Sequence, residues 1–187
     1  MTTVTRLWES TVADWEWPLG LDLWGVIHGI RVFVPLMLAQ DTEAHLVNTA
    51  SVAGLITGPG LGIYKVTKHG VIALSEVLYQ ELLQQNAKVK VSVLCPGWIN
   101  TRIMEAERNR PVVLQNAPGD EAAAHAAQRE ALRQAAQAGM SPDRVAEHVL
   151  HAIREEQFYI LPHPEWKPRI RNRMEDILFE PNPTFPA

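Results

Sequence analysis

Three short apolar runs, separated by long helical patterns, constrain the fold of this chain more than any other feature. The runs cover residues 44–50 (AHLVNTA), 89–95 (VKVSVLC) and 158–161 (FYIL). Helical spacing of apolar residues fills 11–40 and 62–86, and Ser141-Pro142 opens another helix to about residue 156. Strands that alternate with helices form a parallel sheet through right-handed crossovers. We therefore predict an α/β fold with about three parallel strands and flanking helices.

Composition indicates one soluble globular domain with no nucleic-acid or membrane partner. The chain has 187 residues, of which 47% are hydrophobic and 20% are charged, and its net charge of −4 gives no electrostatic signature of nucleic-acid binding. One basic cluster (Lys167, Arg169, Arg171, Arg173) is better explained as a solvated helix face. The longest apolar run, 32–39, contains a proline and is too short to span a bilayer, and no secretory signal is visible. The single Cys95 excludes an internal disulfide, so we expect a cytoplasmic protein.

The residues that can carry chemistry are Ser51, Tyr64 and Lys68, in the run NTASVAGLITGPGLGIYKVTK. Tyr64 and Lys68 are four residues apart in a predicted helix and therefore share a face. A lysine ammonium beside a phenol favours the phenolate, which lowers the tyrosine pKa from its usual value of about 10. Ser51 follows a predicted strand and brings a hydroxyl to the same point. The trio can therefore donate and accept a proton near neutral pH.

Other candidate sites have simpler explanations. His148 and His151 are three residues apart on one predicted helix, but no cysteine or glutamate pair joins them at the usual spacing, so we expect no metal site. The loop at 58–62 (GPGLG) follows a strand and precedes a helix, as a dinucleotide loop does, but its third glycine is misplaced. We interpret this loop as a connection between the serine strand and the tyrosine helix. Cys95 is interpreted as a buried small hydrophobe.

Four segments together resemble the NAD(P)-dependent short-chain dehydrogenase/reductase family: DLWGVIHGI, HLVNTASVAGL, YKVTKHGV and VSVLCPGWINT. The resemblance covers nearly all of residues 7–180. A Tyr-x-x-x-Lys pair alone occurs by chance. The pair becomes specific with a serine thirteen residues earlier, a Pro-Gly after the next strand, and Thr101 four residues past Gly97. The resemblance implies the C-terminal part of a Rossmann-like doubly wound parallel sheet.

The resemblance also implies a role for each matching residue. Tyr64 would be the proton donor in carbonyl reduction and the acceptor in alcohol oxidation, and Ser51 would bind the substrate oxygen. Lys68 would lower the pKa of Tyr64 and hold the nicotinamide ribose hydroxyls. The cofactor-binding positions would be Tyr64, Lys68, Pro96, Gly97, Ile99 and Thr101. Residues 98–140 would form the wall and lid on the substrate side.

One departure from the family lies at Asp22. The family usually has an asparagine in the helix that begins near this position, where it helps to hold a water of the proton relay. Asp22 can also bind water, but it adds a negative charge near Lys68 that opposes the phenolate. We therefore expect Asp22 at the relay position and a less acidic Tyr64. In the simpler alternative, Asp22 only marks a helix boundary.

A second departure lies at the N-terminus. The family begins with a strand, a glycine-rich turn that cradles the cofactor pyrophosphate, and a helix. Residues 1–10 (MTTVTRLWES) lead straight into the segment that follows this half, so we expect residues 1–187 to form a single, N-terminally truncated Rossmann-like domain. Without that turn several charge-assisted hydrogen bonds are lost, each worth roughly 1.5–3 kcal/mol. NAD or NADP is therefore expected to bind weakly, and the residue that selects between them is not in this sequence.

Two functions follow from these patterns. In the first, the chain belongs to an oxidoreductase that transfers hydride between NAD(P) and a carbonyl or alcohol carbon, with Tyr64 handling the proton. In the second, it is a non-catalytic truncated relative that cannot bind a dinucleotide and acts through helix-mediated association. The family often forms dimers and tetramers through its two long helices, here about 11–40 and 62–86, so we expect a homo-oligomer. A small-molecule carbonyl or alcohol is the expected substrate.

Overall fold

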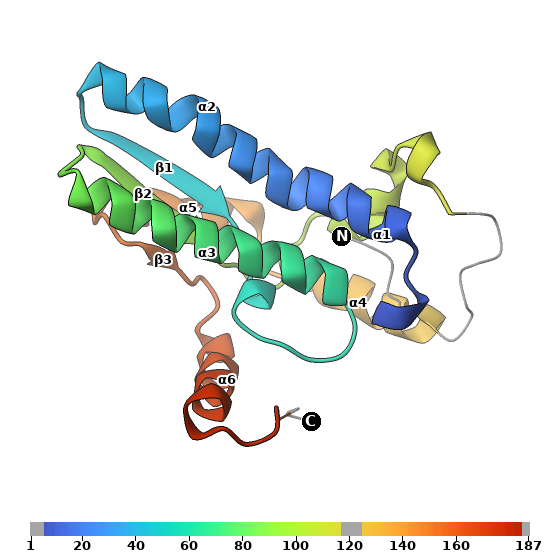
Figure 1. The fold of residues 1–187 in the computed structure, drawn as a ribbon. Helices are drawn as coiled ribbons and strands as arrows, with labels where there is room; N and C mark the ends of the chain where they lie inside the picture. The colour runs from blue at the N-terminus through green and yellow to red at the C-terminus, as the bar shows by residue number, and fades with distance from the viewer. Residues whose placement is uncertain (1–5, 117–124, 185–187) are drawn as a thin grey trace.

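The three predicted strands form one parallel sheet in a computed structural model that describes residues 6–116 and 125–184 (Figure 1). The strands are β1 (Ala44–Thr49), β2 (Val89–Leu94) and β3 (Tyr159–Ile160), in the order β1-β2-β3. Ala44 lies opposite Val89, and Val93 lies opposite Tyr159. The prediction of an α/β fold with about three parallel strands is confirmed.

Helices cover both faces of this sheet. The main ones are α1 (Val12–Pro18), η2 (Leu19–Trp24), α2 (Gly25–Gln40), α3 (Gly62–Gln84), α4 (Ala126–Gln137), α5 (Pro142–Arg154) and α6 (Lys167–Phe179). Single-turn elements join them: η1 (Leu7–Glu9), η3 (Val52–Gly54), η5 (Val112–Leu114) and η7 (Pro164–Trp166), with the longer η4 (Arg102–Asn109) in the expected lid. Ser141 caps α5 by accepting from the Arg144 amide, as its sequence predicts. Helix α4 is rich in alanine and mostly exposed, with Ala136 as its buried residue.

Strand β2 connects the two hydrophobic layers. Its residues Val89, Val91 and Val93 face α2 and α3, where Leu78 and Val71 pack against them. Leu94 points to the opposite face and packs against α5. This alternation is the period-two pattern of a strand that is buried on both sides. Strand β1, at the edge of the sheet, is only half-buried along most of its length.

The helical pattern at 11–40 is one continuous run of three elements, α1, η2 and α2. Its middle element is a π-helical turn, which follows Pro18 directly. Proline has no amide hydrogen to donate, so a widened turn beside it is physically reasonable. By length and composition the run from Val12 to Gln40 could cross a membrane, although a core helix of a soluble protein passes the same test. The apolar run of 32–39 noted in the sequence therefore belongs to a longer apolar helix.

Segments near the C-terminus extend this core. The chain leaves β3, forms η7, and ends in α6, which extends away from the sheet at the lower end of the view (Figure 1). At the right-hand end of the same view, the segment after β2 runs through η4 and η5 and returns to α1. There Arg110 forms a buried ion pair with Asp14, at 2.9 Å. This pair anchors the expected lid to the first helix.

Candidate functional site

Ser51 lies directly after β1 and caps the single turn η3. Its hydroxyl accepts from the Ala53 amide at 3.1 Å and donates to the Pro96 carbonyl at 3.3 Å, and the side chain is buried. The turn lies against α3 so closely that a side chain at Gly54 would come within 2.5 Å of the Lys68 carbonyl oxygen. Gly54 therefore lets the serine turn reach the tyrosine helix.

Tyr64 lies in the first turn of α3 and is only 9% exposed. The pKa of its phenol is raised to about 12: burial raises it most, a hydrogen bond with Ser51 lowers it, and the charge of Asp22 raises it. The prediction that Lys68 lowers this pKa below its usual value is wrong for the protein as it stands. The expectation that Asp22 opposes the phenolate agrees with the direction found. The phenol is protonated at neutral pH and is available as an acid.

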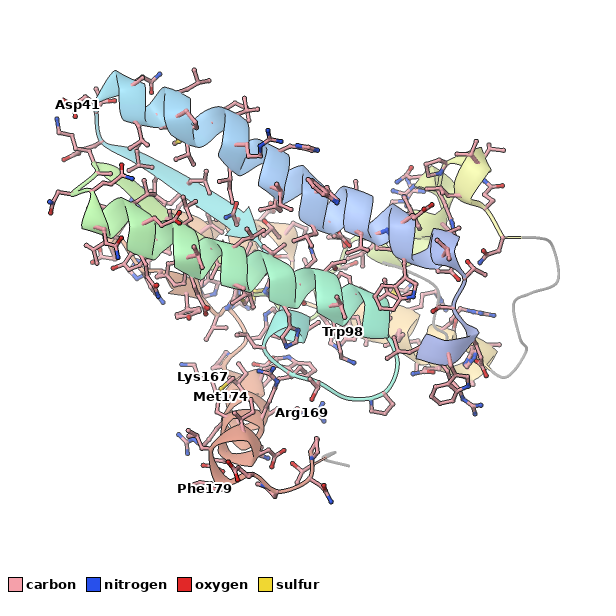
Figure 2. All side chains as sticks on the ribbon, in the orientation of Figure 1. Asp41, Trp98, Lys167, Arg169, Met174 and Phe179 are labelled. Carbon is pink, nitrogen blue, oxygen red and sulfur yellow. The ribbon has the colours of Figure 1, made fainter. Side chains whose placement is uncertain are left out.

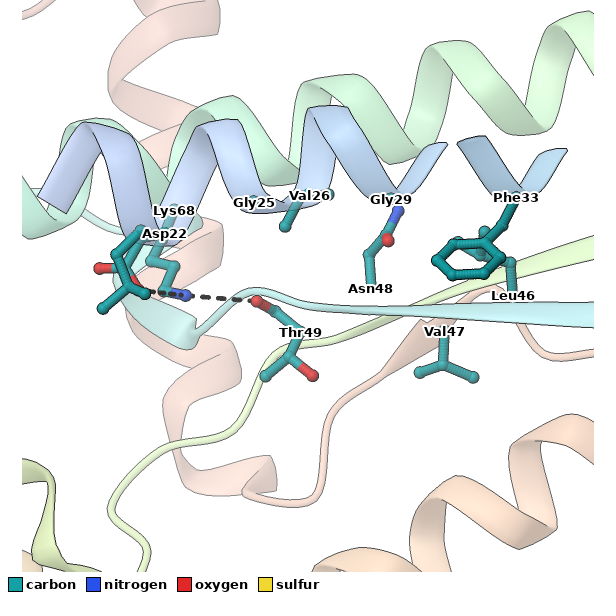
Figure 3. Close-up of a pocket in the computed structure, with 11 residues that line it drawn as sticks. Asp22, Gly25, Val26, Gly29, Phe33, Leu46, Val47, Asn48, Thr49 and Lys68 are labelled. Carbon is teal, nitrogen blue, oxygen red and sulfur yellow. Dashed lines mark hydrogen bonds and ion pairs between the residues drawn. The ribbon is translucent and has the colours of Figure 1, made fainter. Parts of the chain in front are cut away.

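The ammonium of Lys68 is directed to the end of β1 rather than to the phenol oxygen. It donates to the Thr49 carbonyl at 3.3 Å and pairs with an oxygen of Asp22 at 3.5 Å (Figure 3). It also lies 5.5 Å from the centroid of the Tyr64 ring. The carboxylate of Asp22 thus balances the charge of Lys68. Because of this balance, Lys68 does little to lower the pKa of Tyr64.

Asp22 reaches Lys68 from the π-helical turn η2, inside a continuous helix. The alternative that it marks a helix boundary is therefore wrong. Leu23, the next residue, sits against Gly70 of α3, where an added side chain would come within 3.0 Å of a Leu23 methyl carbon. π-Turns within helices are frequent at functional sites, because the extra residue redirects side chains. Here the turn places a carboxylate beside the lysine.

The predicted cofactor-lining residues follow β2 on one loop. Pro96 is tied to the serine turn through its carbonyl, which accepts from Ser51 and from the Val52 amide. Gly97 comes next, and Ile99 pairs as a single bridge with Met140. Thr101 is exposed at the start of η4. The structure thus brings Pro96 to the Ser51 hydroxyl and places the other three positions in sequence along the same loop.

An open pocket of about 450 Å³ borders Lys68 on the free edge of β1. Figure 3 shows Asp22, Gly25, Gly29 and Phe33 above it and the strand residues Leu46 to Thr49 below. An ammonium group at the edge of open space, beside a phenol, is a donor set that suits the hydroxyls of a nucleotide ribose. These residues therefore fit the nicotinamide-ribose end of NAD(P).

The remaining candidates stay apart from this group. His148 and His151 lie on α5, and no cluster of three or more His, Cys, Asp or Glu suited to a metal occurs in residues 6–116 and 125–184. In the 58–62 loop the carbonyls of Gly58 and Gly60 accept from the Lys65 ammonium, at 2.8 and 2.7 Å. That loop is folded back on the tyrosine helix that it introduces. Cys95 is fully buried, and burial raises the pKa of its thiol to about 12.

Sequence reasoning missed three contributors to the site. Gly54 left a weak signal, a glycine three residues after the serine, but its contact with α3 is long-range. The Thr49 carbonyl left no signal because a backbone group carries no sequence identity. His163 binds the loop after β2 through two hydrogen bonds from a position 66 residues downstream of Gly97, a separation no local pattern spans.

Comparison with known proteins agrees with this geometry. A family model described as short chain dehydrogenase matches residues 1–111. A "CLA biosynthesis dehydrogenase/reductase" of Lactiplantibacillus plantarum is 29% identical over 180 residues, which cover 95% of this chain and 63% of the relative. A "C alpha-dehydrogenase" of Sphingobium sp. is 30% identical over 170 residues, which cover 91% of this chain and 54% of the relative. The chain thus spans between about half and two thirds of these relatives.

A solved structure gives the same result. A short-chain dehydrogenase/reductase from Burkholderia phymatum, crystallised with NAD, superposes with a TM-score of 0.96 and 42% sequence identity, over 100% of this chain and 66% of its own. A short-chain dehydrogenase structure from Novosphingobium aromaticivorans gives a TM-score of 0.71 at 29% identity. The catalytic-type residues, the sheet and these matches lead to one conclusion: the chain belongs to the short-chain dehydrogenase/reductase family.

Proposed function

We propose that this chain carries the proton-transfer part of an NAD(P)-dependent oxidoreductase that acts on a carbonyl or alcohol carbon. The observation that carries the proposal is the convergence of Ser51 and Tyr64 at the end of β1, with the ammonium of Lys68 on the same helix face. Two hydroxyls at one point, beside a cation, suit an oxygen that gains or loses a proton.

Each residue has a distinct task in this proposal. Tyr64 donates its phenolic proton to the carbonyl oxygen during reduction, and Ser51 donates a hydrogen bond to the same oxygen. Lys68 pairs with Asp22 while the phenol is protonated, and its charge, 5.5 Å from the centroid of the Tyr64 ring, stabilises the phenolate once the proton has left. Because the pKa of Tyr64 is raised to about 12, the phenol is protonated at neutral pH and holds the proton that carbonyl reduction consumes.

The cofactor would meet the chain along the loop after β2 and at Lys68. Bound NAD(P) supplies the hydride that the protein cannot supply. Tyr64, Lys68, Pro96, Gly97, Ile99 and Thr101 would hold its nicotinamide-ribose end. The residues of this chain include no glycine-rich turn of the dinucleotide type, so by themselves they offer no such donors to the pyrophosphate. We therefore propose weak binding of either cofactor.

A second function, association without catalysis, is supported by the open edge of the sheet. Within residues 6–116 and 125–184, strand β1 has a partner only on the β2 side, and the neighbouring helix α2 exposes Val32, Phe33 and Leu36. Unpaired strand edges and exposed apolar surface favour pairing with another chain. We propose that self-association through α2 and α3 buries part of this surface.

Cofactor titration separates the two functions. Purified protein is titrated with NADH and NADPH while tryptophan fluorescence is followed, and its mass is measured by light scattering. Saturable binding in the millimolar range, with slow reduction of small ketones that Tyr64→Phe abolishes, supports the enzyme. No binding at the highest cofactor concentration reached, together with a stable oligomer, supports association alone. Micromolar binding would contradict the argument from the missing turn.

A further inference from the structure

The loop after β2 is held from two sides by different parts of the chain. On one side the Ser51 hydroxyl and the Val52 amide both donate to the Pro96 carbonyl, at 3.3 and 3.0 Å. On the other side stands His163, in the segment that follows β3. Its ring contacts the next two residues of the loop, so consecutive backbone groups of the loop are fixed by distant residues.

His163 bridges two backbone groups with its two ring nitrogens. The Gly97 amide donates to Nδ1 at 3.1 Å, and Nε2 lies 3.2 Å from the Trp98 carbonyl oxygen. Since Nδ1 accepts, the ring proton resides on Nε2, which donates to Trp98. The side chain is 8% exposed, so both contacts lie away from bulk water. Only the neutral Nε2–H tautomer satisfies both partners.

The rings of His163 and Trp166 both pack closely against Gly97. A side chain at Gly97 would come within 2.7 Å of the Trp166 indole nitrogen and 3.0 Å of His163 Cγ. Arg169 covers the Trp166 ring, 5.2 Å from its centroid, and Figure 2 shows Arg169 on α6. The Trp98 carbonyl also accepts from the Met140 amide at 3.0 Å. His163 thereby joins the loop, the end of the expected lid and the C-terminal segment.

We propose that His163 is a positioning residue that fixes the backbone of Gly97 and Trp98 in the shape that presents this loop to the nicotinamide. We call the two hydrogen bonds of His163 to Gly97 and Trp98 the clamp. The role of this loop in holding the nicotinamide rests on the proposed function, whereas the clamp does not. The imidazole does not reach the reacting atoms; it acts through the loop. Losing it leaves the Gly97 amide without its partner and the Trp98 carbonyl with the Met140 amide alone, and the loop gains freedom where the cofactor ring would lie.

Three variants test the clamp. His163→Leu keeps the bulk and removes both hydrogen bonds; His163→Gln restores one donor and one acceptor; His151→Leu, at an exposed histidine on α5, is the matched control. Amide hydrogen exchange at Gly97 is expected to be at least about tenfold faster in His163→Leu than in wild type, and close to wild type in the other two. Equal exchange in His163→Leu and wild type, or equal acceleration in the leucine and glutamine variants, would overturn the clamp.

Two further readouts are available, and the first needs no variant, so it tests the hydrogen bonds of His163 even if His163→Leu does not fold. In the wild type, nitrogen chemical shifts of the His163 ring are expected to show the Nε2–H tautomer at neutral pH; the other tautomer would overturn the proposal. For the loop, the dissociation constant for NADH is expected to rise about tenfold or more in His163→Leu and to recover in His163→Gln. Unchanged affinity in a wild type that binds NADH overturns the positioning role alone. Absence of binding in the wild type overturns the proposed function, while exchange still decides the clamp.

Discussion

Replacing Asp14 by alanine tests how the expected lid is anchored. Its two carboxylate oxygens bind Arg110 at 2.9 Å and the Asn116 amide at 3.0 Å, both from the lid side, as well as Thr11. The paired side chains of Asp14 and Arg110 are only 3–4% exposed. Removing one partner of a buried ion pair costs about 3–5 kcal/mol, and the Arg110 charge then keeps a longer contact with the more exposed Glu107, at 3.6 Å. This cost is a large part of a typical free energy of unfolding, about 5–15 kcal/mol.

The assay is urea unfolding followed by tryptophan fluorescence. With a slope of about 2 kcal/mol per molar urea, the midpoint of Asp14→Ala should fall by roughly 1.5–2.5 M. The control is Glu130→Ala. Its pair with Arg133 is shorter, at 2.6 Å, but about half exposed and screened by water, so its loss should move the midpoint much less. Equal midpoints for the two variants would refute the argument that burial, rather than distance, sets the strength of an ion pair.

The pH dependence gives an independent check on the same pair. Burial disfavours the charged form of Asp14, but hydrogen bonds from Thr11, Asn116 and Arg110 outweigh it, so the pKa of the carboxyl lies below its usual value. The unfolded chain then binds the proton first as the pH falls. The stabilisation is present above an unfolded pKa of about 3.9 and is lost as the pH falls through the folded value. The difference between wild type and Asp14→Ala should therefore shrink in strong acid; a constant difference would contradict this reasoning.

Three further predictions concern the candidate site. Asp22→Asn removes the carboxylate whose charge raises the pKa of Tyr64, so this pKa should fall below about 12. Ultraviolet titration of the phenolate, with Tyr64→Phe as the blank, measures it. An unchanged pKa would mean that the charge of Asp22 does not contribute. Gly54→Ala places a methyl group within 2.5 Å of the Lys68 carbonyl oxygen and should lower the free energy of unfolding, measured with urea, by about 1–3 kcal/mol. Gly29→Ala is the control, because its added carbon meets nothing within 4 Å, and it should not destabilise the protein. In an active preparation, alcohol oxidation should accelerate as the pH rises toward about 12, while carbonyl reduction should not; a common pH profile would argue against Tyr64 as the proton carrier.

The local pattern of apolar residues was sufficient to predict the helices and strands but not the contacts between them. The strands at 44–49 and 89–94 and the helix at 62–84 follow from apolar periodicity, and the four-residue spacing of Tyr64 and Lys68 places them on one face. The π-turn at Asp22 was invisible because one extra residue hardly alters a helical pattern. The raised pKa of Tyr64 depends on burial and on Asp22, which approach through the tertiary fold.

The same limit applies to the lid and to His163. Asp14 and Arg110 are 96 residues apart, and neither residue type signals the other. Irregular segments such as the one around η4 carry no hydrophobic period from which a shape can be read. Recognition of the family supplied the roles of Ser51, Tyr64 and Lys68, whereas the structure supplied their partners.

Turnover at high cofactor concentration tests the central claim most directly. Wild-type protein and Tyr64→Phe are incubated with millimolar NADH or NADPH and a panel of small ketones, and consumption of the reduced nicotinamide is followed. Positioned general acids contribute about 10²–10⁴-fold to such reactions, so Tyr64→Phe should lose at least about a hundredfold in rate while its cofactor affinity stays the same. Equal turnover by the two proteins, or no turnover by wild type with bound cofactor, would contradict the account.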